Sequence, residues 1–264
     1  MKTDFEMIVH RFPENNDLTV VPISDVHFGT MGHMQKEWKA FCENVLKSPH
    51  TYVTLGGDLI NNATRSSVSN IFEETMRPSQ QKRLMAEMLK PLAENNRILC
   101  AVGGNHEKRS GKDVDDDPML DIMCKLDLED LYRENMAFVK LDIGKQRTNG
   151  QKNPTYVLAV THGAGGGLFT GTAVTKNERF GYAIDGIDAL IVGHTHKGAL
   201  SKPAKLRVDP RHNIVTLKPF VVAISVPWLN YGGYALRQMM LPATSGDPQI
   251  IKLAGKEKKV KLEW

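Results

Sequence analysis

The chain has 264 residues, of which 41% are hydrophobic and 24% are charged, close to the averages for soluble globular proteins. This composition excludes an intrinsically disordered chain, a collagen-like repeat and a small disulfide-stabilised scaffold. The net charge of +4 and the pI near 8.8 are compatible with an anionic ligand, but they are too small for a dedicated nucleic-acid-binding protein.

The sequence also limits the expected cellular location. The three cysteines are scattered without CxxC spacing, which indicates thiols in a reducing compartment. No apolar run approaches the roughly 20 residues of a membrane span. Residues 1–12 mix charged and apolar side chains, unlike a signal or transit peptide. We therefore expect a cytoplasmic protein without a membrane partner.

Hydrophobic periodicity predicts an alternation of strands and helices in the first half of the chain. In chain order, the predicted elements are strands at 5–9 and 18–23, a helix over 34–47, a strand at 52–55, a helix over 80–95 that Pro91 kinks or shortens, a strand at 98–102, and a helix over 118–126 capped by Asp117. Further strands are predicted at 138–143, 156–160, 189–192, 214–217, 221–226 and 250–253. This order favours a single α/β domain over residues 1–264 with two sheets or one large mixed sheet.

Five of these apolar runs end directly before side chains that can bind a metal ion. In chain order these side chains are Asp25 and His27, Asp58, Asn105, His162, and His194 with His196. Sites in α/β proteins form where strands end and loops converge. Any one histidine alone fits an ordinary core or surface position better, but five strand ends with the same feature favour one shared site.

The ligand types indicate which ions such a site would bind. Oxygen and imidazole ligands without thiolate suit Mn²⁺, Fe, Zn²⁺ or Ni²⁺, of which Mn²⁺ is our first expectation. Seven candidates exceed the roughly four protein ligands of one catalytic ion, which indicates two divalent ions that share a carboxylate. A pair of ions about 3.5–4 Å apart suits in-line attack on phosphorus.

The blocks around these residues resemble the signature motifs of the calcineurin-like metallophosphoesterases. They are Asp25-x-His27, Gly57-Asp58, Gly104-Asn105-His106-Glu107, Thr161-His162-Gly163 and Gly193-His194-Thr195-His196. Glu107 stands where the family more often has Asp. Residues 162–167, 176–182 and 228–234 are reminiscent of compact phosphoesterases encoded by bacteria and their phages.

The resemblance implies a four-layer α/β/β/α sandwich of two mixed β-sheets flanked by helices. It also implies two ligand sets that share Asp58: Asp25, His27, Asp58 and His196 for one ion, and Asp58, Asn105, His162 and His194 for the other. A hydroxide held between the ions would be the nucleophile. His106 would lie beside the substrate and protonate or stabilise the leaving oxygen.

Together these features predict a metal-dependent hydrolase of phosphoric esters, with phosphodiesters such as nucleotides or nucleic acid as the expected substrates. The diester preference depends on the intact His106 and on the mild positive charge. Arg109 is predicted to bind substrate, although an exposed basic residue in a loop is an equal interpretation. The alternatives are a phosphomonoesterase acting on proteins or nucleotides, a nuclease subunit that needs an ATPase partner, and a non-catalytic scaffold. The sequence leaves the native metal and a homodimer open.

Overall fold

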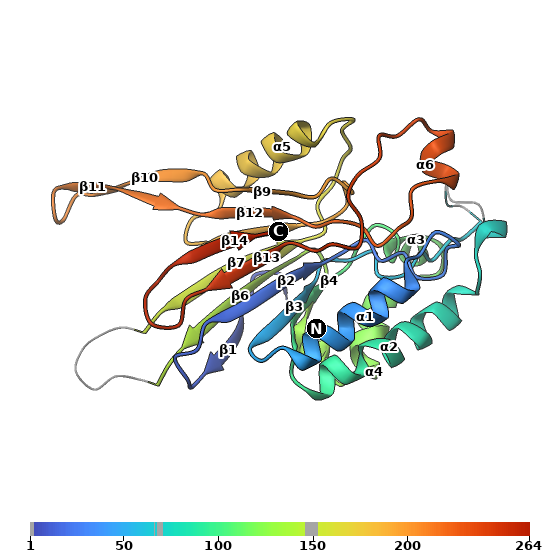
Figure 1. Ribbon diagram of the computed structural model, residues 1–264, viewed down its shortest axis with the longest axis horizontal. Helices are drawn as coiled ribbons and strands as arrows, with labels where there is room; N and C mark the ends of the chain where they lie inside the picture. Colours follow the sequence, from blue (N-terminus) through green and yellow to red (C-terminus); the bar gives the residue numbers. More distant parts are fainter. Residues whose placement is uncertain (1–2, 66, 68–70, 146–152) are drawn as a thin grey trace.

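The structure, a computed structural model, describes residues 3–65, 67, 71–145 and 153–264. Two six-stranded sheets lie face to face, with helices on their outer sides (Figure 1). The first sheet has the spatial order β14 (Val260–Glu263), β13 (Ile250–Leu253), β2 (Leu18–Ile23), β3 (Thr51–Leu55), β4 (Ile98–Val102) and β5 (Tyr132–Arg133). The second has the order β1 (Ile8–Phe12), β6 (Met136–Ile143), β7 (Thr155–Thr161), β8 (Ala189–Val192), β12 (Val221–Ile224) and β9 (Ala199–Ser201). Both sheets contain parallel and antiparallel pairs.

Three apolar clusters hold four layers together. Helices α1 (Gln35–Lys47), α2 (Pro78–Glu94) and α4 (Pro118–Lys125) pack on the outer face of the first sheet. A second cluster fills the space between the sheets, and α5 (Thr170–Ala183) covers the outer face of the second sheet. Short helices lie in the connections: η1 (Ile71–Glu73), α3 (Lys108–Val114), η2 (Glu129–Leu131) and α6 (Gly233–Arg237). The predicted α/β/β/α sandwich is confirmed.

Most predicted elements form within a residue or two of their expected bounds, and two differ for identifiable reasons. The first strand lies at Ile8–Phe12 rather than 5–9, because its position is set by parallel pairing with β6, and Phe5 is exposed. Helix α2 continues through Pro91 to Glu94. The missing N–H leaves the Glu87 carbonyl unpaired on the exposed side of the helix, where water can bind it.

Helix α5 was not expected from the sequence, because its threonines and two glycines have low helix propensity. Packing explains its position. A Cβ atom at Gly181 would lie 2.4 Å from a ring carbon of Phe220, so only glycine allows the helix to approach the second sheet this closely.

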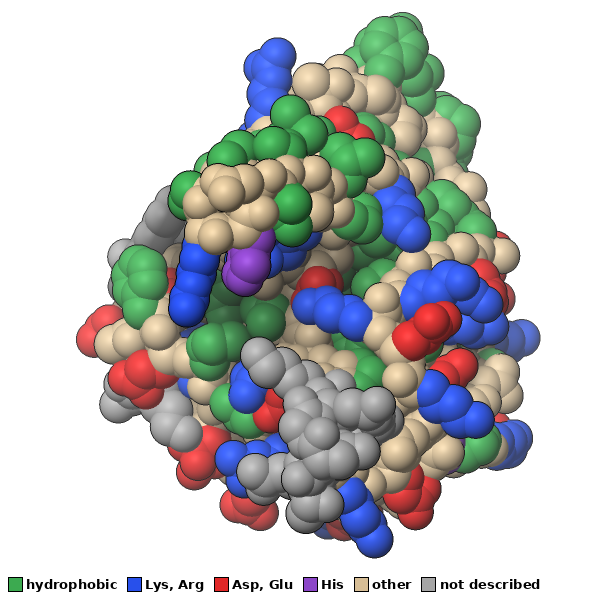
Figure 2. Space-filling view, turned by 90° about the vertical axis from the view of Figure 1, so that its left-hand side faces the viewer, with side chains coloured by type: hydrophobic (Ala, Val, Ile, Leu, Met, Phe, Trp, Pro, Cys, Tyr) green, Lys and Arg blue, Asp and Glu red, His purple; other side chains and the backbone are tan. Residues whose placement is uncertain are grey.

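Strands β10 (Ala204–Asp209) and β11 (Ile214–Pro219) form a separate antiparallel arm that projects from the sandwich (Figure 1). Leu206 lies opposite Leu217 and Val208 opposite Val215, and these four side chains are between 60% and 73% exposed. Figure 2, which faces the end of the molecule from which the arm projects, shows hydrophobic side chains gathered in its upper part. Across the residues that the structure describes, none of the helices is both long and apolar enough to cross a membrane.

Candidate metal centre

The candidate ligands lie where strands of both sheets end. Strands β2, β3 and β4 run parallel in the first sheet, and β7 runs parallel to β8 in the second. The carboxyl ends of parallel strands lie at one edge of a sheet, so the loops that follow them converge. The loops after β2, β3 and β4 carry Asp25, Asp58 and Asn105, and those after β7 and β8 carry His162 and His194.

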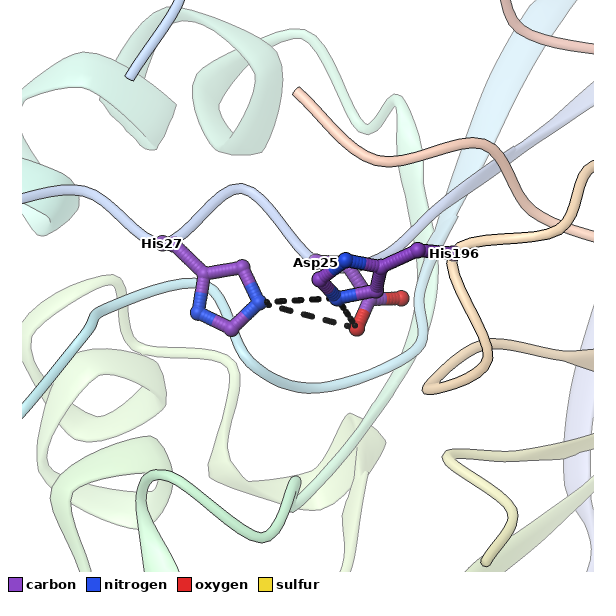
Figure 3. A group of neighbouring side chains, drawn as sticks. All are labelled: Asp25, His27 and His196. Atoms are coloured by element: carbon purple, nitrogen blue, oxygen red, sulfur yellow. Dashed lines mark hydrogen bonds and ion pairs between the residues drawn. The ribbon is translucent and has the colours of Figure 1, made fainter. Parts of the chain in front are cut away.

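One group of donor atoms joins the β2 loop to the β8 loop (Figure 3). His196 Nε2 lies 3.1 Å from Asp25 Oδ1 and 3.1 Å from His27 Nε2. His27 Nε2 lies 3.8 Å from the same Asp25 oxygen. Donor atoms that share an ion at about 2.1 Å are themselves roughly 3 Å apart, so these three side chains have suitable spacing for one cation.

A second group joins the β3, β4, β7 and β8 loops. Asn105 Oδ1 lies 2.9 Å from His162 Nε2 and 2.7 Å from His194 Nδ1. His162 Nε2 also lies 3.2 Å from Asp58 Oδ2. All seven side chains predicted as ligands therefore come together in these two groups.

Asp58 lies between the groups. Its Oδ2 atom is 3.2 Å from His162 Nε2 in one group and 4.0 Å from His27 Nε2 in the other. Asp58 is 1% exposed, so a single buried carboxylate oxygen faces imidazoles from both sheets.

Neighbouring groups orient both carboxylates by holding one oxygen of each. Asp25 Oδ2 accepts hydrogen bonds from Ser24 Oγ at 2.6 Å and from the His194 N–H at 2.9 Å. Asp58 Oδ1 accepts one from the His106 N–H at 2.8 Å. The other oxygen of each carboxylate is left to face the imidazoles. Such supporting contacts are typical of metal ligands.

The backbone at the candidate ligands is unusual. Five of the seven ligands adopt the left-handed conformation, with φ of 54° at Asp25, 46° at His27, 52° at Asp58, 68° at His194 and 52° at His196. This region is unfavourable for residues other than glycine, and such strain concentrates at functional sites.

Without a bound cation, protons on neighbouring imidazoles offset the negative charge of the two carboxylates. Burial would raise the pKa of both carboxyls, but neighbouring imidazoles outweigh it, and the pKa of Asp25 and that of Asp58 lie below the usual range. Burial lowers the pKa of His162, yet the Asp58 carboxylate overcomes it and raises that pKa to about 10. The Asp25 carboxylate likewise raises the pKa of His196 against the effect of burial. A divalent cation would replace these protons, so the donor set fits such an ion.

His106 and Arg109 form a pair at the edge of the site. His106 Nδ1 lies 2.9 Å from the Asn61 carbonyl oxygen, which fixes the ring by accepting its N–H. His106 Nε2 lies 3.7 Å from Asp58 Oδ2 and 2.9 Å from Arg109 Nη2. Arg109 Nη1 also donates to the Asn61 carbonyl at 3.0 Å. The guanidinium predicted to bind substrate is thus held against the ring predicted to act on the leaving oxygen.

Comparison with known proteins identifies the family. A family model described as calcineurin-like phosphoesterase matches residues 18–198. The chain belongs to this family. The chain is therefore a metal-dependent hydrolase of phosphoric esters, and its His and Asp clusters suggest a divalent metal centre.

The fold can also be compared with solved structures. A conserved uncharacterized protein of Streptococcus pneumoniae, described as a predicted phosphoesterase, is 11% identical over 94% of this chain and 97% of its own, with a TM-score of 0.35. The NAD nucleotidase of Haemophilus influenzae is 11% identical over 94% of this chain and 49% of its own, with a TM-score of 0.40. The sequence matches no curated protein.

Sequence reasoning did not identify three buried polar residues that support this phosphoesterase site. Ser24, Asn62 and Glu107 do not face the cluster of donor atoms, but they bond the loops that carry it. Glu107 lies within a recognised motif, and its burial between two ligand loops could not be foreseen from spacing. Ser24 and Asn62 carry no comparable signal in the sequence.

Metal binding by this phosphoesterase is expected to release protons, because the pKa of His162 and that of His196 are raised in the absence of a cation. The His162 imidazole, with a pKa of about 10, is then protonated at pH 7, and the raised pKa of His196 acts in the same direction. The apparent affinity for Mn²⁺ should therefore rise with pH, by about tenfold per pH unit for each proton released. Isothermal titration calorimetry in buffers of different ionisation enthalpy measures the number of protons released when Mn²⁺ binds. His10→Gln, which removes a half-buried histidine bonded to the Leu99 carbonyl, is the matched control. Zero net release at pH 7 would contradict the prediction.

Proposed function

We propose that this chain is a two-ion phosphodiesterase. In this proposal Asp25, His27, Asp58 and His196 hold one ion, and Asp58, Asn105, His162 and His194 hold the other. The position of Asp58 Oδ2, 3.2 Å from His162 Nε2 and 4.0 Å from His27 Nε2, is the observation that carries the assignment. A carboxylate oxygen with that position can contact two cations at once.

The chain's own residues have distinct parts in this scheme. When bound, divalent ions polarise the phosphoryl oxygens and lower the pKa of an attacking water. Asp25 and Asp58 supply the negative charge, and the carbonyl of Gly56, 2.8 Å from His162 Nδ1, keeps the Nε2 atom of that ring turned to the site. Asp25, Asp58 and His162 are buried, which strengthens the electrostatic contacts among them, whereas Asn105 lies on the exposed side of the site.

His106 and Arg109 would act together on the leaving oxygen. Burial, with His27 and Arg109 nearby, lowers the pKa of His106 to about 3, so its ring is neutral at pH 7. The carbonyl of Asn61 accepts a hydrogen bond from the Nδ1–H group, and Nε2 accepts one from Arg109. We infer that the pair stabilises the leaving oxygen by hydrogen bonding, with the Arg109 N–H oriented by the ring.

The pairing of Arg109 also supports a diester substrate. Recognition of a terminal phosphate dianion favours bidentate contacts from arginine side chains to the phosphate oxygens. Here the guanidinium bonds to the His106 ring and to the Asn61 carbonyl, and we therefore assign it to the leaving oxygen rather than to a terminal phosphate. A diester carries one negative charge and needs less positive charge from the protein.

A substrate screen tests the proposed function. The Mn²⁺-reconstituted protein should hydrolyse bis(p-nitrophenyl) phosphate and short linear diesters with a kcat/KM at least tenfold above that for p-nitrophenyl phosphate. Cyclic nucleotides, nucleoside monophosphates and oligonucleotides in the same screen define the substrate class. Preference for the monoester would reverse the diester assignment, and no turnover with any ester would refute the proposed function.

We also propose that residues 1–264 form one domain. The family match ends at residue 198, yet β12 and β13 lie beyond it and complete both sheets. Strand β12 pairs with β8, and β13 pairs with β2, both of which precede ligand loops. Removal of residues 199–264 would therefore expose the edges of the strands that carry the site.

A further inference from the structure

Glu107 bonds to two ligand loops at once. Its carboxylate is 1% exposed and accepts four backbone hydrogen bonds. Oε2 accepts from the N–H groups of Asp58 at 2.9 Å and Gly104 at 3.0 Å. Oε1 accepts from the N–H groups of Leu59 at 2.7 Å and Ile60 at 3.2 Å. A side chain from the β4 loop therefore binds three successive N–H groups of the β3 loop.

Asn62 makes the reciprocal connection. This residue follows the same turn of the β3 loop, is fully buried, and has a left-handed backbone with φ of 46°. Its Nδ2 atom donates to the carbonyls of His106 at 2.9 Å and Glu107 at 3.3 Å, both on the β4 loop. Each loop thus extends one polar side chain to the backbone of the other.

These contacts surround the residues whose positions matter most for the site. The N–H group of Asp58 donates to Glu107. Asp58 Oδ1 accepts a hydrogen bond from the His106 N–H, and Oδ2 faces both groups of donor atoms. The loops also approach closely, because a Cβ atom at Gly104 would lie 2.1 Å from Asp58 Oδ1. A small shift of one loop against the other would separate Asp58 from Asn105.

We propose that Glu107 is a positioning residue, which with Asn62 locks the β3 and β4 loops in the one arrangement that places Asp58 and Asn105 in a shared metal centre. A carboxylate suits this position because it offers acceptors to all four N–H groups and no donor. Glutamine has the same shape, but its amide N–H groups would face two of the N–H donors. The inference about metal rests on the proposed function, whereas the inference about the loops does not.

Hydrogen exchange on the apoprotein tests the lock directly. In Glu107→Gln, the amides of residues 58–60 and 104 should exchange at least tenfold faster, while amides in the strand cores keep their wild-type rates. Asp188→Asn is the matched control, because Asp188 is a buried carboxylate that accepts the Val157 N–H at 2.9 Å at the opposite end of β8. In this control the amides of residues 58–60 should exchange at their wild-type rates.

The consequence for metal is measured separately. Glu107→Gln should bind Mn²⁺ about 10–100-fold more weakly than wild type, and its Co²⁺ form should have an altered visible spectrum, as expected when a supporting contact is lost. Glu107→Asp keeps the charge but is one methylene shorter. Its Mn²⁺ affinity should lie between those of wild type and Glu107→Gln. If wild type binds no metal, the proposed function fails and the lock is judged by hydrogen exchange alone.

Two results would overturn the proposal. One is wild-type exchange at residues 58–60 in Glu107→Gln, and the other is wild-type metal affinity together with an unchanged Co²⁺ spectrum. If Glu107→Gln does not fold, Asn62→Ala decides by the same measurements, since it removes the reciprocal donor. Faster exchange in Asn62→Ala at residues 105–107 and weaker metal binding support the lock, and wild-type values for both refute it.

Discussion

Asp58→Asn is expected to reduce metal-dependent turnover of bis(p-nitrophenyl) phosphate by about 10³-fold or more. The change keeps the shape of the side chain and the Oδ1 acceptor of the His106 N–H at 2.8 Å. It replaces Oδ2, which faces His162 and His27, with an amide nitrogen that cannot bind a cation. If Asp58 is shared by two ions as proposed, its loss removes several kcal/mol of transition-state stabilisation, which corresponds to about three powers of ten in rate.

Metal content and turnover should be measured together for Asp58→Asn. Elemental analysis after dialysis is expected to show fewer than two ions per chain, with circular dichroism unchanged. Asp142→Asn is the control, because this carboxylate lies at the far end of β6 and bonds to Thr155. Retained activity with two bound ions in Asp58→Asn would rule out the shared carboxylate.

The sequence predicted which segments form strands, and where they end, better than it predicted how the strands pair. Apolar runs such as 18–23 and 98–102 are largely buried on both faces, and polar residues or glycines follow them, so local pattern alone marks them as strands. The pairing of β13 with β2 and of β12 with β8 joins residues more than thirty positions apart, for which no local pattern exists. The division into two sheets became visible only through the family resemblance.

The candidate site shows the same limit. Ligand types and their positions after strands identified the seven side chains, and the structure brings them together from both sheets. The left-handed backbone at Asp25, His27 and Asp58 could not be predicted, because sequence rules assign that region to glycine. Such conformations persist because the loops hold each other through bonds like those of Glu107 to the N–H groups of residues 58–60.

The two sheets contribute different parts of the site, and this division gives the core between them a functional role. Asp25, Asp58 and Asn105 follow strands of the first sheet, whereas His162 and His194 follow strands of the second. The relative position of the two sets depends on the apolar layer between the sheets and on a few hydrogen bonds across them, such as that of the His194 N–H to Asp25. Substitutions in that layer are therefore expected to act on the metal centre as well as on stability.

His106→Ala is expected to lower kcat for diesters with alkyl alcohol leaving groups by about 10²–10⁴-fold, while the protein retains its bound metal. The ring is not needed to hold Asp58, because the contact to Asp58 Oδ1 comes from the backbone N–H of His106. Its loss removes the partner of Arg109 Nη2 at 2.9 Å, the contact that in the proposed function orients the guanidinium toward the leaving oxygen.

The dependence on the leaving group separates this role from that of a ligand. If His106 and Arg109 stabilise the leaving oxygen, His106→Ala should slow diesters with alkyl alcohol leaving groups far more than bis(p-nitrophenyl) phosphate, whose leaving group is acidic and needs little help. His212→Ala, which removes an exposed histidine on the β10–β11 arm, should behave as wild type with both. Loss of metal in His106→Ala would instead indicate that the imidazole is a metal ligand. Equal slowing of both substrates would indicate that His106 acts on a step other than departure of the leaving group.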